Sequence, residues 1–111
     1  MKQYYKVVTH NNNSLGLRKN PNILNFPIGI WVYEHNDLDY SNNDYGGIWV
    51  TQTLSGARGL VRYMMKKSIK ENNPILSKVI IYKCEIGEIL YENSYRVKTD
   101  KVKLIDTIKI Y

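Results

Sequence analysis

Alternating and β-branched residues recur in short stretches along this chain, and polar or turn-forming segments separate them. Such stretches, rich in Val, Ile and Tyr with a period of two, are typical of β-strands. The strand-like stretches are 3–9, 28–33, 48–53, 78–86, 88–92, 94–98 and 101–110. The pattern therefore predicts a protein built mainly of strands.

One segment has a helical period instead. Apolar residues fall at helical spacing at Ala57, Leu60, Val61, Met64 and Met65. Thr53 or Ser55 can cap the first turn, and Asn72-Asn73-Pro74 ends the pattern. We expect one main helix from about Leu54 to Ile69.

The order of these elements favours an α+β fold. Residues 1–111 are the length of a single compact domain, with a twisted, mostly antiparallel sheet and one main helix. The polar segment 34–47 predicts a long, mobile surface loop with few hydrogen bonds. If the last strand is regular, Asp106 shares the apolar face of Val102, Leu104, Ile108 and Ile110.

Composition excludes several classes of protein. The single cysteine, Cys84, rules out an intramolecular disulfide and a multi-cysteine zinc site, and its strand pattern favours a buried, inert thiol. The two histidines are 25 residues apart, and neither a P-loop nor a G-x-G-x-x-G motif is present, so no metal site is expected. No apolar run could span a membrane, and the N-terminus lacks a secretory pattern; the expected location is cytoplasmic.

The charge is basic and unevenly distributed. There are 16 Lys and Arg residues against 10 Asp and Glu, a net charge of +6, which favours a phosphate-bearing partner. Arg58, Arg62, Lys66 and Lys70 repeat every four residues along the predicted helix. Arg58 is a candidate anion ligand near the helix N-terminus, and Arg62, one turn later, could contribute to the same site. The alternative is that these four cations only form the solvated face of the helix. A basic helix facing the acidic loop of another copy would instead make a homo-oligomer.

Several short motifs resemble one family. Tyr45-Gly-Gly-Ile-Trp-Val-Thr, followed by Leu54-Ser-Gly-Ala-Arg and Tyr63, is similar to the G-x-G-I-Y-F-A strand and S-x-S-A-x-x-Y helix of ADP-ribosyltransferases of the diphtheria-toxin and poly-ADP-ribose-polymerase type. The stretch from Ile80 to Gly87 resembles that family's following strand, L-L-x-x-E-V-A-L-G. The first predicted strand is followed by His10, as in the family.

The resemblance implies roles for particular residues. His10 would hold a ribose, Trp49 and Tyr63 would stack on the nicotinamide ring, and Ser55 would bind the carboxamide. Asp106 and Glu88 are the candidates for the catalytic acid. Trp49 stands where the family has tyrosine and Ala57 where it has serine, which implies an altered active site. NAD would be substrate or ligand, and no other cofactor is implied.

Two hypotheses of different classes follow. The first is a domain that binds a nucleotide or an NAD-derived ligand in a cleft formed by the first strand, residues 46–53 and the start of the helix. It would either transfer ADP-ribose or only sequester the ligand, as suits a phage or mobile-element counter-defence protein. The second is a non-enzymatic module, of an inhibitor type, that docks on a protein or nucleic acid through its basic helix.

Overall fold

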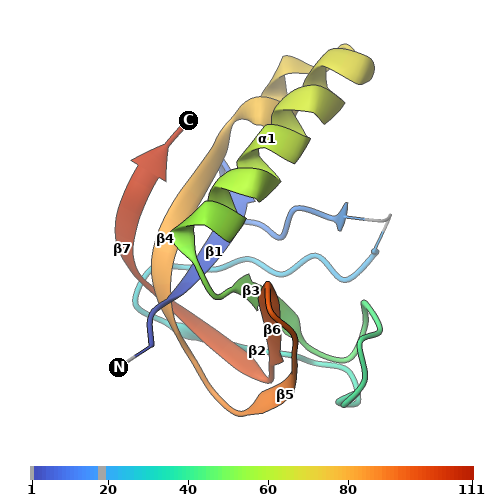
Figure 1. The fold of residues 1–111 in the computed structure, drawn as a ribbon, viewed down its shortest axis with the longest axis vertical. Helices are drawn as coiled ribbons and strands as arrows, with labels where there is room; N and C mark the ends of the chain where they lie inside the picture. The colour runs from blue at the N-terminus through green and yellow to red at the C-terminus, as the bar shows by residue number, and fades with distance from the viewer. Residues whose placement is uncertain (1, 18–19) are drawn as a thin grey trace.

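The computed structural model describes residues 2–17 and 20–111, and within them seven strands form one antiparallel sheet beside a long helix (Figure 1). None of the helices in this part of the chain combines the length and apolar character needed to cross a membrane. The fold is α+β, as the sequence predicts. The elements are β1 (Tyr4–Thr9), β2 (Trp31–Tyr33), β3 (Ile48–Thr51), α1 (Leu54–Lys70), the 3₁₀ helix η2 (Pro74–Ser77), β4 (Val79–Ile86), β5 (Ile89–Glu92), β6 (Arg96–Thr99) and β7 (Lys101–Ile110).

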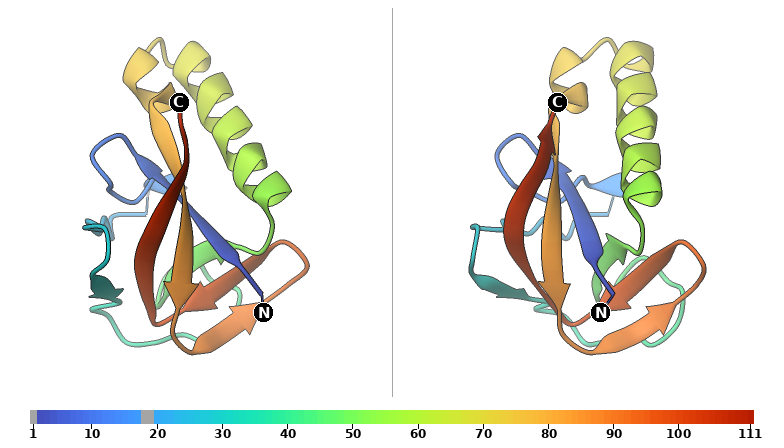
Figure 2. Two further views of the ribbon diagram at one scale, coloured as in Figure 1. Left: turned by 90° about the vertical axis from the view of Figure 1, so that its left-hand side faces the viewer. Right: turned by 60° about the vertical axis from the view of Figure 1, so that its left-hand side comes forward.

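The order of strands across the sheet is β2-β7-β4-β1-β3-β6-β5, and every neighbouring pair is antiparallel. The β3–β6–β5 end turns across the lower part of β1, β4 and β7 (Figures 1 and 2). A strongly twisted sheet of this kind presents two faces that must be covered separately.

Helix α1 covers one face. Thr53 caps it, because its hydroxyl oxygen accepts a hydrogen bond from the amide of Gly56 at 3.0 Å. Its buried side chains are Ala57, Val61, Met64 and Ser68. The first three pack with residues of β1 and β4, including Val7 and Ile81. The sequence places Met65 on the apolar face, but this side chain is exposed. Ser68, one turn after Met64, is buried against the sheet in its stead.

On the opposite face, the two parts of the twisted sheet pack against each other. Its core combines residues of β1, β4 and β7 with residues of β3 and β6, and Phe26, fully buried, fills the space between them. Cys84 belongs to this core, and burial raises the pKa of its thiol to about 12, so the prediction of a buried thiol is confirmed.

Strand ends differ from the sequence prediction where a side chain or a turn stops the ladder. The side-chain oxygen of Asn93 accepts hydrogen bonds from the amides of Tyr95 and Arg96, so β6 begins two residues later than expected. Gly29, at φ +78°, makes a turn before β2.

Asp106 does not share an apolar face. Register shifts in the β4–β7 ladder interrupt the alternation of β7, so Leu104 is buried while Asp106, Ile108 and Ile110 are exposed. The expectation from a regular strand is therefore wrong here.

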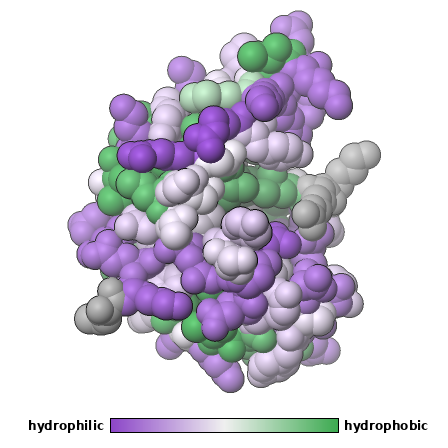
Figure 3. Space-filling model, in the orientation of Figure 1, coloured by the Kyte–Doolittle hydropathy of each residue, from purple (hydrophilic) through white to green (hydrophobic). Residues whose placement is uncertain are grey.

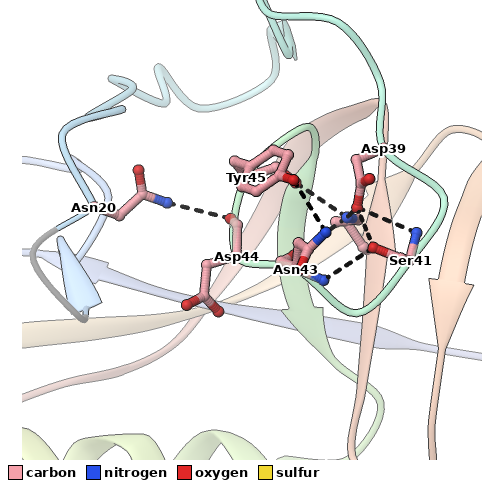
Figure 4. A network of polar contacts seen from close by, with 7 residues as sticks. Asn20, Asp39, Ser41, Asn43, Asp44 and Tyr45 are labelled. Atoms are coloured by element: carbon pink, nitrogen blue, oxygen red, sulfur yellow. Dashed lines mark hydrogen bonds and ion pairs between the residues drawn. The ribbon is translucent and has the colours of Figure 1, made fainter.

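The 34–47 loop is tied to the sheet by a buried lysine, so the expectation of few hydrogen bonds is wrong. Lys98 of β6 has no exposed surface, and its Nζ donates to Asp39 Oδ2 at 2.8 Å, to the Tyr45 carbonyl at 3.0 Å and to the Asn43 carbonyl at 3.2 Å. Asn20 adds a hydrogen bond from its side-chain amide to the Asp44 carbonyl, at 3.2 Å (Figure 4).

Two glycines make room for this arrangement. A Cβ on Gly47 would overlap the side-chain stem of Lys98, and a Cβ on Gly46 would overlap Asp39. Gly46 also has φ +74°, a conformation that other residues rarely adopt. The Gly-Gly pair therefore lets the loop approach β6 closely enough for Lys98 to reach three acceptors.

Replacing Lys98 with Met tests how much the lysine contributes to stability. Met keeps most of the apolar stem but leaves the loop acceptors without their donor, so we expect a loss of about 2–4 kcal/mol in the free energy of unfolding. Lys109→Met, at an exposed position of β7, is the matched control and should change stability by less than about 0.5 kcal/mol. Denaturant titration measures both; equal midpoints for the two variants would contradict the structural role of Lys98.

The same contact predicts an acid-sensitive component of stability. Hydrogen bonds from Lys98 and Ser41 lower the pKa of Asp39 from 3.8 to about 2. A carboxyl with a depressed pKa stabilises the fold above its ordinary pKa, and this stabilisation is lost as the pH falls from about 4 to about 2. Thermal unfolding across this range should therefore show a steeper acid dependence in the unchanged protein than in Asp39→Asn.

Candidate functional site

A pocket of about 530 Å³ lies where β1 and β3 diverge. The two strands share a single register pair, Tyr5 with Thr51, whereas β1 and β4 share six. Beyond that pair β1 and β3 are no longer hydrogen-bonded to each other. The pocket lies in the gap between them, next to the N-terminal half of α1. This volume lies within the range usual for small-molecule sites.

The pocket has walls from four parts of the fold. The described residues that line it come from β1, from β3 with Gly47, from α1, and from the connections around them together with Arg96 at the start of β6. In Figure 3 an apolar, green band crosses the surface below α1 between hydrophilic, purple regions. The apolar lining includes Leu15, Leu17, Leu24 and Leu60, and the polar lining includes Lys6, Asn20, Asn22, Glu34, Asp44 and Arg96.

Lys6 is the unusual residue of the pocket. It pairs with Tyr82 across β1 and β4, so it belongs to the core-facing side of β1. Its Nζ donates to the Trp49 carbonyl at 2.8 Å and lies 5.3 Å from the centre of the Phe26 ring. Within the described residues no carboxylate lies within ion-pair distance of it. Burial lowers the pKa of this ammonium from 10.5 to about 8.

Trp49 lines the same pocket from β3. Tyr5 and Thr51 are register partners, so their side chains lie on the same face of the sheet, and Trp49, two residues from Thr51, lies on that face too. The Arg96 guanidinium lies 3.8 Å from the centre of the indole ring, and Tyr91 meets the ring edge-on. The indole Nε1 is buried and has no hydrogen-bond partner among the described residues, which costs about 1–3 kcal/mol.

Two acids also line the pocket, both from the polar connection after β2. The Glu34 carboxylate accepts hydrogen bonds from the side-chain amides of Asn22 and Asn36 at 2.9–3.0 Å. Asp44 is placed by the hydrogen bond from Asn20 to its carbonyl, which joins two lining segments (Figure 4). The pocket thus combines cationic, anionic and aromatic groups.

Of the ligand residues expected from the sequence, the structure places only Trp49 and Tyr63 in this pocket. The pocket does lie between the three segments expected to form the cleft. Ser55, Arg58 and Arg62 are exposed on the outer side of α1 and do not line it. His10 lines a second cavity of about 230 Å³, together with Met64 and Leu76.

The two catalytic candidates also lie elsewhere. Glu88 is exposed between β4 and β5, and Asp106 is exposed on β7, two strands away from β1. Neither lines the pocket. The described residues contain no group of three or more His, Cys, Asp or Glu side chains arranged to hold a metal ion.

Sequence reasoning missed Lys6 and the two acids. The sequence did hold a signal for Lys6. In the first strand, Lys6 alternates with Tyr4 and Val8 on the apolar side, where a hydrophobic residue is usual. Nothing in the local pattern indicates that Glu34 and Asp44 line this pocket, because their position depends on the path of a long connection.

Comparisons of this chain with protein-family models, with curated proteins and with solved structures find no significant match.

Proposed function

We propose that this protein binds a nucleotide or an NAD-derived ligand in the pocket between β1, β3 and α1. The observation that supports the proposal most is Lys6, which lines the pocket and whose ammonium has no carboxylate partner among the described residues. Taking a charge out of water without a counter-ion is unfavourable, and an anionic ligand group would offset that cost.

A purely structural role explains only part of this arrangement. The hydrogen bond from Lys6 satisfies the Trp49 carbonyl, which any neutral donor would also do. Lys98 shows how the same fold treats a lysine that serves structure, because it is fully buried and has Asp39 as its counter-ion at 2.8 Å. The contrast supports a ligand anion as the partner of Lys6.

The other lining residues suit the rest of a nucleotide. Tyr63 is 49% exposed and lines the pocket, so its ring is available for stacking on a planar base or nicotinamide. Glu34 and Asp44 supply carboxylate oxygens of the kind that accept hydrogen bonds from ribose hydroxyls.

ADP-ribosyl transfer would be the enzymatic form of this proposal. A carboxylate must then stabilise the oxocarbenium-like centre, and of the acids in the described residues Glu34 and Asp44 line the pocket. They would take the role for which the sequence offered Asp106 and Glu88 as candidates. In this proposal the protein acts in the cytoplasm. It is a phage or mobile-element product that sequesters or modifies a host nucleotide as a counter-defence.

The first test measures binding of NAD and ADP-ribose by thermal shift and calorimetry. A ligand at about 100 times its Kd should stabilise the fold by about 2.7 kcal/mol. Tyr63→Ala should weaken binding at least about tenfold through lost stacking, and Lys6→Met should weaken it through lost charge. Arg58→Ala, outside the pocket, is the control and should bind like the unchanged protein. If neither ligand binds, or if Arg58→Ala alone abolishes binding, the proposed site is wrong.

The second test uses pH. Burial sets the pKa of Lys6 in the free protein near 8, so above that pH the amine is increasingly neutral. The affinity for ADP-ribose, whose pyrophosphate stays ionised in this range, should fall by up to about tenfold per pH unit above about pH 8. Tyr63→Ala should keep this slope at lower affinity, whereas Lys6→Met should lose it. A flat profile in the unchanged protein between pH 7 and 9.5 would exclude Lys6 as the anion ligand.

A further inference from the structure

The outer face of α1 carries a row of four exposed cations, Arg58, Arg62, Lys66 and Lys70. Their four-residue spacing separates neighbours by about 6 Å along the helix axis and extends the row over about 18 Å. No acid occurs between the first and last residues of α1. Hydrophilic side chains, purple in Figure 3, follow the helix at the upper right of the molecule.

The fold does not neutralise this row. The described residues contain no carboxylate within 4.0 Å of any of the four cations. An ion pair at the C-terminal end of α1 joins a different lysine, Lys67, to Glu71 at 4.0 Å. Like charges four residues apart repel one another on a helix. Arg58 also lies next to the first turn of α1, where the helix dipole disfavours positive charge. The free protein therefore holds these cations at an electrostatic cost.

Gly59 adds an independent observation on the same face. A Cβ at this position would meet only the Arg62 guanidinium, at an ordinary distance of 3.8 Å, so packing does not require glycine. Glycine inside a helix lowers stability, because it loses more backbone entropy than other residues. What glycine does provide is a place where another molecule can approach the backbone of α1 closely.

We infer that α1 docks on the phosphate backbone of duplex DNA, with Arg62 and Lys66 at the centre of the contact. The row winds about 40° round the helix at each four-residue step. Over its length of about 18 Å it can follow a polyanion that carries one charge for about every 1.7 Å of its axis. An α-helix also fits the major groove, which is about 12 Å wide. This surface is distinct from the pocket proposed above, because none of the four cations lines it.

Two features of the row favour duplex DNA over other partners. The middle of this face carries the exposed cations Arg62 and Lys66, as protein–DNA interfaces do, and the exposed apolar side chains Met65 and Ile69 lie beside them. Protein partners usually cover a centre that is depleted of charge. Proteins that hold single strands present several aromatic rings for stacking, whereas Tyr63 is the aromatic residue that α1 provides.

The test is fluorescence anisotropy of the full chain with a labelled 20-base-pair duplex over a range of salt concentrations. If four phosphates are contacted, the slope of log K against log salt should be near about −3.6. Arg62→Gln and Lys66→Gln should each reduce the magnitude of this slope by about 0.9 and weaken binding at least about tenfold at low salt. Lys109→Gln removes the same charge from the exposed part of β7 and should bind like the unchanged protein.

Gly59→Gln separates docking from folding. Glutamine is a better helix former than glycine, so the melting temperature should equal or exceed that of the unchanged protein. Its side chain should hinder close approach and weaken duplex binding. Unchanged binding by Arg62→Gln and Lys66→Gln, an equal loss with Lys109→Gln, or tighter binding to a single strand or to poly-glutamate than to the duplex would each overturn the proposal.

Discussion

The divergence of β1 from β3 after one register pair is the constraint on which the rest of this structure depends. Beside Tyr5 and Thr51 the sheet is continuous, and beyond that pair it splits into two parts that face each other across Phe26. A split sheet has backbone groups that no neighbouring strand satisfies, and such groups are costly when they are buried. The Lys6 ammonium meets one of them, the Trp49 carbonyl, and the pocket occupies the space that the split leaves.

The two strand lysines show how position decides the role of a charged side chain. Lys98 on β6 reaches a carboxylate and two carbonyls, which fixes the 34–47 loop, and with it Asp44, at the edge of the pocket. Lys6 on β1 reaches one carbonyl and the face of an aromatic ring. The first arrangement is complete within the protein, because the charge has its counter-ion. The second lacks a counter-ion among the described residues, and it lines a pocket.

How far the sequence predicts this structure depends on the range of the interactions involved. The helix, its Thr53 cap, the burial of Cys84 and the seven strands follow from periodicity, capping and local composition, and all are present. Strand ends and the exposure of Asp106 depend on the Asn93 turn and on register shifts in β7, which local patterns do not contain. The pocket lies between the expected segments, but its charged residues come from connections whose path only the folded chain defines.

Most of the sequence is locally consistent with its fold, which makes the exceptions informative. Thr53, Asn93 and Gly46 each adopt the conformation or hydrogen bond that their residue type favours. The unfavourable features are concentrated in two places. At the pocket, Lys6 lacks a counter-ion and the indole nitrogen of Trp49 lacks an acceptor, both within the described part of the chain.

On the outer face of α1, a row of like charges surrounds a glycine that packing does not require. Natural sequences depart from local consistency mainly where binding or catalysis demands it. Anions would relieve the charge imbalance at both places, although the two surfaces lie on different sides of α1 and differ in shape. The pocket, with its aromatic walls, suits a small ligand, and the exposed row of cations along α1 suits a polymer.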